Sequence, residues 1–172
     1  MLKFANRFSA EFLNKFPWAF QLDTYGFTTV ADLSLSAAAS ASATTLSVAS
    51  TSTFPTSGMI MIKGLPITYT GTTATTFTGC SGVDRALESG DAVCLGYSMP
   101  SNFGRPSTLF LGNVEYQFEH RTQNIDPAQY TYTMVTTYLF LPVASTASNL
   151  CVLHYYKKAT DNAAVTDTAE IM

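Results

Sequence analysis

The side chains that most often carry out chemistry are few in this sequence, and they are widely separated. Its two histidines, His120 and His154, have no other candidate ligand at metal-site spacing around them. Cys151 lies close to His154, but an odd offset within a strand places two side chains on opposite faces. That arrangement removes the simplest cysteine–histidine nucleophile. We therefore expect each histidine to be a strand residue with a satisfied hydrogen bond.

The densest group of charges consists of Asp84, Arg85, Glu88 and Asp91, within an expected loop. A calcium ion would need several oxygen ligands at a regular spacing, and this segment has no such pattern. We interpret the group as a local ion-pair network or a subunit contact. A cation site is the alternative that the spacing favours less.

Acidic pairs and short motifs do not indicate a catalytic site either. Glu115 and Glu119 lie on one face of an expected strand, and a solvated face explains them. A glycan hydrolase would need two carboxylates in a cleft. The phosphate-binding and nucleophile-elbow motifs do not occur in the sequence. We predict that the protein is not an enzyme, with no catalytic residue, no cofactor and no metal.

The composition favours a folded protein that makes few electrostatic contacts. The 172 residues suit one domain with an appended arm or insertion. Charged residues make up 12% of the chain, against roughly 25% in an average soluble domain. A net charge of -3 predicts neither specific nucleic-acid binding nor a polybasic membrane surface. No signal peptide and no apolar stretch of membrane-spanning length are expected.

The three cysteines, Cys80, Cys94 and Cys151, are odd in number and lack C-x-x-C spacing. Such a set is typical of free buried thiols in a protein that assembles in a reducing cytosol. A disulfide between Cys80 and Cys94 is the alternative.

Residues 1–33 are expected to form an aromatic arm. Phenylalanine recurs every four residues, which predicts an amphipathic helix that ends at Pro17, with a more extended segment after it. The aromatic stripe either packs on the core of its own chain or docks onto a neighbouring subunit. In the second interpretation, the interface residues are Phe4, Phe8, Phe12, Phe16, Trp18 and Phe20. The mixed charges on another face argue against membrane insertion.

The rest of the chain divides into four parts. Residues 34–43 are rich in serine and alanine and suit a flexible linker, although alanine would also tolerate a short helix. Residues 44–95 consist of short strands separated by turns, and seven of the eleven residues from Thr68 to Thr78 are threonine. Residues 96–158 supply the remaining strands, and residues 159–172 form a polar tail. We predict a mainly β protein, a β-sandwich or small barrel with an inserted β-module.

Three strand segments are expected within residues 96–158. Residues 109–120 form one strand, or a pair that breaks at Gly112 and Asn113. Residues 130–141 form the longest strand, because β-branched and aromatic residues fill it. Residues 149–158 are expected to be its hairpin partner.

Four short runs in residues 44–95 resemble a recurrent β-module of tailed-bacteriophage virion proteins. They are TLSV at 45–48, FPTSG at 54–58, ITYTG at 67–71 and TTFTGC at 75–80. The loop that follows, SGVDR at 81–85, differs from the R-G-x-x-G-T sequence found at this place in the module. The role of that loop in the module is therefore not assigned to residues 81–85. The runs LHYYKKATD at 153–161 and TDTAEI at 166–171 are similar to head-to-tail adaptor proteins of these phages.

The resemblance implies a structural component of a tailed-phage virion. Its expected place is the head–tail junction (the neck or connector) or the tail, assembled in the cytoplasm of the host bacterium. The expected partners are other copies of itself and virion proteins such as portal, capsid or tail proteins, with no membrane. The alternatives are a capsid cement or decoration protein and a glycan- or host-binding module of a tail fibre.

Overall fold

The structure, a computed structural model, describes residues 21–118, 131–141 and 149–158. Within these ranges the fold is mainly β and contains no helix, as the sequence predicted. In chain order the strands are β1 (Leu22–Thr28), β2 (Leu33–Ser34), β3 (Thr45–Ser47), β4 (Gly58–Ile62), β5 (Leu65–Tyr69), β6 (Gly71–Thr72), β7 (Thr76–Thr78), β8 (Ala92–Leu95), β9 (Tyr97–Ser98), β10 (Phe103–Leu111), β11 (Val114–Phe118), β12 (Thr131–Val135), β13 (Tyr138–Phe140) and β14 (Leu150–Lys157).

The larger part of the fold is a seven-stranded sheet in the order β1-β14-β10-β11-β12-β13-β9. All of its neighbouring strands are antiparallel except β11 and β12, which pair in parallel. The sheet curls so that its two edge strands approach each other. The rings of Phe27 on β1 and Tyr97 on β9 lie 4.5 Å apart between centroids. We refer to these seven strands as the curled sheet.

The concave side of the curled sheet holds its own apolar core. Alternation along β14 shows how the sequence builds it, because Cys151, Leu153 and Tyr155 are buried while the residues between them are partly exposed. Leu109 on β10 and Leu139 on β13 are completely buried in the same core. Apolar residues at every second position of a strand produce this one-sided burial.

Strands β2 to β8 form a second unit, which we call the small sandwich (residues 33–95). A four-stranded sheet, β2-β8-β4-β5, packs on a three-stranded sheet, β3-β7-β6, around one core. Ile60 and Ile62 on β4, Ile67 on β5, and Leu46 on β3 have no exposed surface in that core. The two cores are largely separate, and among the described residues only Tyr97 packs against both.

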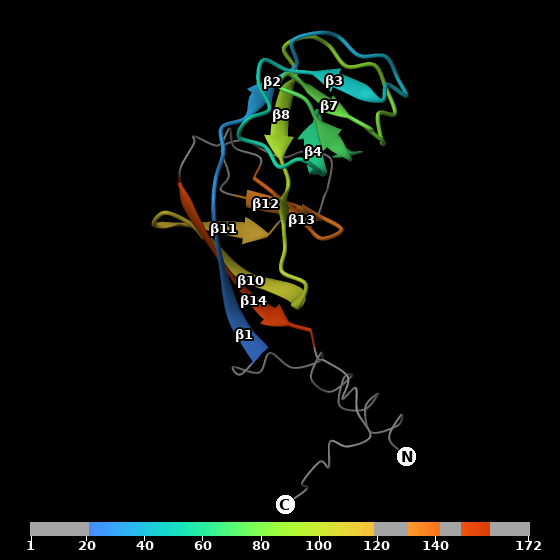
Figure 1. Ribbon diagram of the computed structural model, residues 1–172. Helices are drawn as coiled ribbons and strands as arrows, with labels where there is room; N and C mark the ends of the chain where they lie inside the picture. Colours follow the sequence, from blue (N-terminus) through green and yellow to red (C-terminus); the bar gives the residue numbers. More distant parts are fainter. Residues whose placement is uncertain (1–20, 119–130, 142–148, 159–172) are drawn as a thin grey trace, which may run out of the picture.

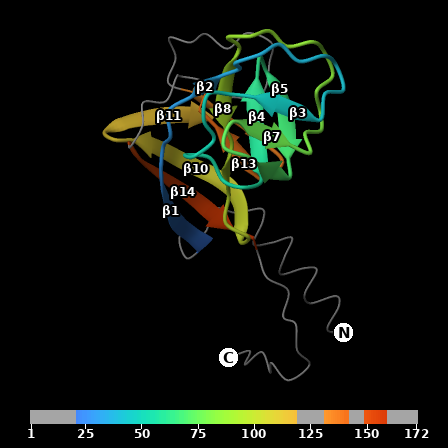
Figure 2. The same cartoon turned by 45° about the horizontal axis from the view of Figure 1, so that its top comes forward.

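The small sandwich is inserted into the chain between β1 and β9, and it lies at one end of the curled sheet (Figure 1). Figure 2 shows β1, β14 and β10 side by side below it. At the opposite end of the curled sheet, Leu22 pairs with Tyr156. Both terminal segments, 1–20 and 159–172, therefore attach to the fold at the end remote from the small sandwich.

The junction between the two units depends on the absence of a side chain at Gly96. A Cβ atom there would lie 2.6 Å from Cζ of Phe140 and 2.9 Å from the backbone oxygen of Met59. Phe140, on β13, is 1% exposed. The glycine thus lets the Phe140 ring of the curled sheet pack directly against the backbone at residue 96, where the chain leaves the small sandwich.

The structure corrects the linker predicted at residues 34–43. This segment belongs to the small sandwich: Leu35 bridges to Val48, Ala39 bridges to Leu87, and Leu35 is only 2% exposed. Ala39 and Ala43 also pack against the core. Their small side chains, which suggested flexibility, allow the backbone to lie close to the core surface. The ordered unit therefore starts at Leu33 and not at residue 44.

Two strand predictions near the C-terminal end are also corrected. The predicted strand at 130–141 is a hairpin, β12 and β13, which turns at Thr136 with a positive φ of 55°. β14 pairs with β1 and β10 and not with this segment. The physical reason is that residues 22–28, assigned from sequence to the arm, form a strand that occupies one side of β14. The alternative break at Gly112 and Asn113 is confirmed, with β10 and β11 on either side.

Candidate functional site

His154 lies on β14 as an ordinary strand residue. Its Nδ1 atom is 3.2 Å from the hydroxyl oxygen of Thr24, and its ring packs against Phe110. Cys151 is completely buried in the core of the curled sheet, whereas His154 lies on the partly exposed face. The prediction that these two side chains lie on opposite faces is confirmed. His120 and Glu119 lie outside the described residues, so their roles stay predictions.

The three cysteines are free, and no disulfide joins Cys80 to Cys94. Burial, together with the nearby Asp32 carboxylate, raises the pKa of Cys94 to about 12. Burial also raises the pKa of Cys151 to about 12 and that of Cys80 above its usual value. These thiols are therefore protonated at neutral pH, and a protonated thiol is a poor nucleophile.

The charged loop forms an ion-pair network centred on Lys63, which sequence reasoning missed. Its Nζ atom lies 2.8 Å from Asp91 and 3.7 Å from Glu88. Asp91 also accepts a hydrogen bond of 2.8 Å from the backbone N–H of Glu88, and Arg85 donates to the carbonyl oxygen of Lys63. Lys63 stands at the turn between β4 and β5, far from the other charges in sequence, so no local spacing indicated it.

The interpretation as an ion-pair network is confirmed for Glu88 and Asp91, with Lys63 as the cation. Arg85 bonds a carbonyl oxygen and not a carboxylate, and the subunit contact stays a prediction. Within the described ranges, no group of three or more histidine, cysteine, aspartate or glutamate side chains could hold a metal ion. The hydrogen bond from Lys63 is the main cause that lowers the pKa of Asp91, followed by the bond from the Glu88 backbone. The same pairing raises the pKa of Lys63.

Replacement of the aspartate is expected to make folding less sensitive to acid. The pKa of Asp91 is lower in the folded state, so its charged form stabilises the fold above about pH 4, the usual aspartate value. That stabilisation is lost as the pH falls through the lowered pKa. In Asp91→Asn the free energy of unfolding should therefore be reduced at pH 7, and the deficit should shrink toward pH 2. Urea denaturation followed by circular dichroism measures both.

The control for this experiment is Glu88→Gln, because the Glu88 side chain is 82% exposed and lies farther from Lys63. Exposed ion pairs contribute little to stability, so this variant should differ little from the parent protein at either pH. A deficit in Asp91→Asn that stays constant from pH 7 to pH 2 would show that the ion pair does not couple folding to pH.

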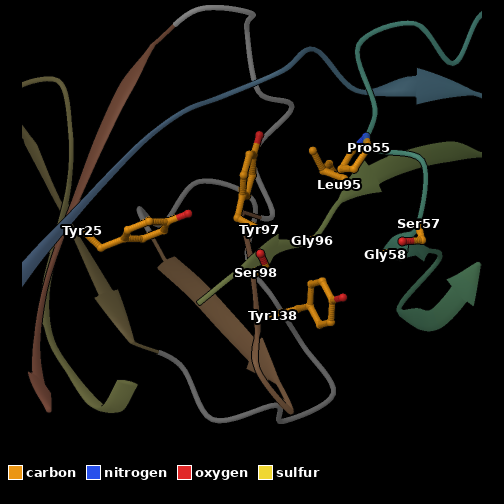
Figure 3. Close-up of a pocket in the computed structure, with 9 residues that line it drawn as sticks. All are labelled: Tyr25, Pro55, Ser57, Gly58, Leu95, Gly96, Tyr97, Ser98 and Tyr138. Atoms are coloured by element: carbon orange, nitrogen blue, oxygen red, sulfur yellow. The ribbon is translucent and has the colours of Figure 1, made fainter. Parts of the chain in front are cut away.

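A concave site in the described part of the chain lies between the two units, and we call it the junction pocket. Its volume is about 200 Å³. Three strands of the curled sheet and two segments of the small sandwich contribute to it (Figure 3). The lining residues are Tyr25, Pro55, Ser57, Gly58, Leu95, Gly96, Tyr97, Ser98 and Tyr138.

The fold holds the walls of this pocket in place. Tyr69, which is buried in the small sandwich, donates a hydrogen bond of 3.0 Å to the carbonyl oxygen of Pro55. On the other side, the hydroxyl oxygen of Tyr97 accepts the backbone N–H of Val30 at 2.9 Å. Tyr25, Tyr97 and Tyr138 come from different strands, β1, β9 and β13. Sequence reasoning missed the pocket for that reason, and the only available signal was the abundance of tyrosine.

The six aromatic residues predicted as a subunit interface, Phe4, Phe8, Phe12, Phe16, Trp18 and Phe20, all lie outside the described residues. Their role therefore stays a prediction. In the described ranges, no helix is both long and apolar enough to cross a membrane. No family model, no curated protein and no solved structure matches this chain.

Proposed function

We propose that this protein is a structural component of a tailed-bacteriophage virion. Its place is the head–tail junction or the tail, and it assembles there as a homo-oligomer. The main support is that the apolar residues of the four phage-like runs lie in the core of the small sandwich. Leu46, Val48, Phe54, Ile67, Tyr69, Phe77 and Cys80 are each at most 7% exposed. The residues that resemble the phage module are thus the core residues of one folded unit. A shared module would produce such a resemblance, because its core residues determine its fold.

The position of the small sandwich is consistent with a mechanical role. It lies at one end of the curled sheet, while both terminal segments attach at the other end. One end is then available for a different virion protein, such as a portal, capsid or tail protein. The other end carries the aromatic arm, which in this proposal docks onto a neighbouring copy.

A sheet edge lies next to the attachment points of the two terminal segments. Among the described strands, β1 pairs only with β14, so it forms an edge of the curled sheet. Leu22 at the start of β1 is 43% exposed. An edge strand with exposed apolar side chains is a surface that another subunit can cover. These features support side-by-side packing of identical copies.

The position of the protein in intact particles tests the proposal most directly. Purified virions would be imaged by electron cryomicroscopy, with Fab fragments against the small sandwich as markers. We expect symmetric labelling of the neck or tail. Labelling over the capsid lattice would favour the cement protein instead, and labelling at fibre tips would favour the host-binding module. Absence of the protein from purified particles would contradict a virion role altogether.

A further inference from the structure

The junction pocket is lined from both units of the fold. Tyr25 reaches into it from β1, while Ser57 and Gly58 close it on the side of the small sandwich (Figure 3). Tyr138 stands between these two walls. The pocket is thus built from segments that are distant in the chain, and it exists only when the two units are in contact.

Hydroxyl groups dominate the polar part of this lining. Within the described part of the chain, the side-chain hydroxyls of Tyr25, Ser57, Ser98 and Tyr138 have no hydrogen-bond partner among the described residues. Tyr97 differs, since its hydroxyl oxygen accepts the Val30 N–H. A hydroxyl can both donate and accept a hydrogen bond. A ligand that carries several hydroxyl groups can hydrogen-bond to these side chains, because each hydroxyl on either side can act as donor or acceptor.

The lining also excludes charged ligands and offers apolar surface. None of its residues carries a charge, so a phosphate or carboxylate would lose its hydration without gaining an ion pair. The tyrosine rings, Pro55 and Leu95 provide apolar faces beside the hydroxyls. Sugar rings combine the same two features, because their C–H groups form apolar patches and their rims carry hydroxyls.

The size of the pocket limits the ligand to a small unit. Its volume of about 200 Å³ is below the roughly 300–1,000 Å³ of pockets that enclose drug-sized ligands. A proline-rich peptide, the other common ligand of tyrosine-rich surfaces, needs an extended groove for several residues. We propose that the junction pocket binds one neutral pyranose unit of a glycan. This inference goes beyond the proposed function, since a structural place in a virion does not require sugar binding.

The test uses the purified full-length protein and the methyl glycosides of glucose, galactose, mannose and N-acetylglucosamine. Binding would be measured by saturation-transfer NMR and by titration of the protein's amide resonances. We expect at least one neutral glycoside to bind with a dissociation constant in the millimolar range. N-acetylneuraminic acid, which carries a carboxylate, should bind at least tenfold more weakly.

Variants of pocket residues test whether the glycoside binds in the junction pocket. Tyr138→Ala removes both ring and hydroxyl and should weaken binding at least tenfold, whereas Tyr138→Phe keeps the ring and should have a smaller effect. Because Tyr138→Ala could disturb the junction, Ser57→Ala provides a second, milder change that should also weaken binding. The matched control is Tyr156→Ala on β14, which lies under Arg105 and outside the pocket, and it should bind as the parent protein does.

Several outcomes would overturn the inference. They are the absence of binding by every neutral glycoside at high millimolar concentration, equal losses in Tyr138→Ala and Tyr156→Ala, and tight binding of a proline-rich peptide with no sugar binding. Each of these results would leave the virion localisation unchanged. A failure here is therefore distinguishable from a failure of the proposed function.

Discussion

Deletion of residues 1–20 is expected to convert the proposed homo-oligomer into a monomer that keeps its β structure. The described fold begins at Gln21, and every residue of β1, from Leu22 to Thr28, pairs with a residue of β14. The deletion therefore removes all six predicted interface residues and keeps every described residue of the two cores. Light scattering coupled to size-exclusion chromatography measures the mass, and far-ultraviolet circular dichroism measures the β content.

The expected size of this effect follows from the burial of aromatic side chains. A buried phenylalanine contributes about 1.5–3 kcal/mol, and about 1.4 kcal/mol changes a dissociation constant tenfold. If half of the six predicted interface residues are buried against a neighbour, their loss should weaken assembly by at least about a thousandfold. Replacing Phe4, Phe8, Phe12, Phe16, Trp18 and Phe20 by alanine in the full chain should reproduce the deletion.

The matched control changes the other face of the arm. Replacing Lys3, Arg7, Glu11 and Lys15 by glutamine keeps the length and the aromatic stripe, so the oligomer should persist. An oligomer that survives the deletion of residues 1–20 would contradict the docking of the arm, and so would a full-length protein that is monomeric at every concentration.

The second large effect is expected from Phe77→Ala in the small sandwich. Phe77 has no exposed surface, and its ring lies 4.8 Å from that of Tyr69 and 5.5 Å from that of Phe54 between centroids. Truncation leaves a cavity between these rings and should lower the free energy of unfolding by about 3–5 kcal/mol. That is a large fraction of the roughly 5–15 kcal/mol that stabilises an ordinary domain. Urea denaturation followed by circular dichroism gives the value.

Phe110→Ala is the matched control, because it removes the same atoms from a different environment. Phe110 lies on β10, half-buried and edge-on to His154, outside both apolar cores. Its loss should cost at most about 1 kcal/mol. Equal losses in the two variants would mean that Phe77 does not support a separate core in the small sandwich.

Several features of the fold could be predicted because they depend on a few adjacent residues. The turn at Gly112 and Asn113 follows from the ability of glycine to adopt a positive φ without steric cost, here 58°. The opposite placement of Cys151 and His154 follows from the period of a strand. The mainly β fold follows from short apolar runs separated by turn residues.

Other features depend on contacts between distant segments, and local patterns did not reveal them. Residues 34–43 have the composition of a linker, yet Leu35 and Ala39 are held by Val48 and Leu87, which only the folded chain brings near. Lys63 joins Asp91 for the same reason.

Strand periodicity and turn chemistry are set within a few residues, so the residue order alone was sufficient to predict a mainly β protein. Tertiary packing decided which strands lie on either side of β14. It also created the pocket between Tyr25, Tyr138 and Ser57. Side-chain alternation tells which face of a strand is apolar, but it does not tell which other strand will cover that face or pair with its edge.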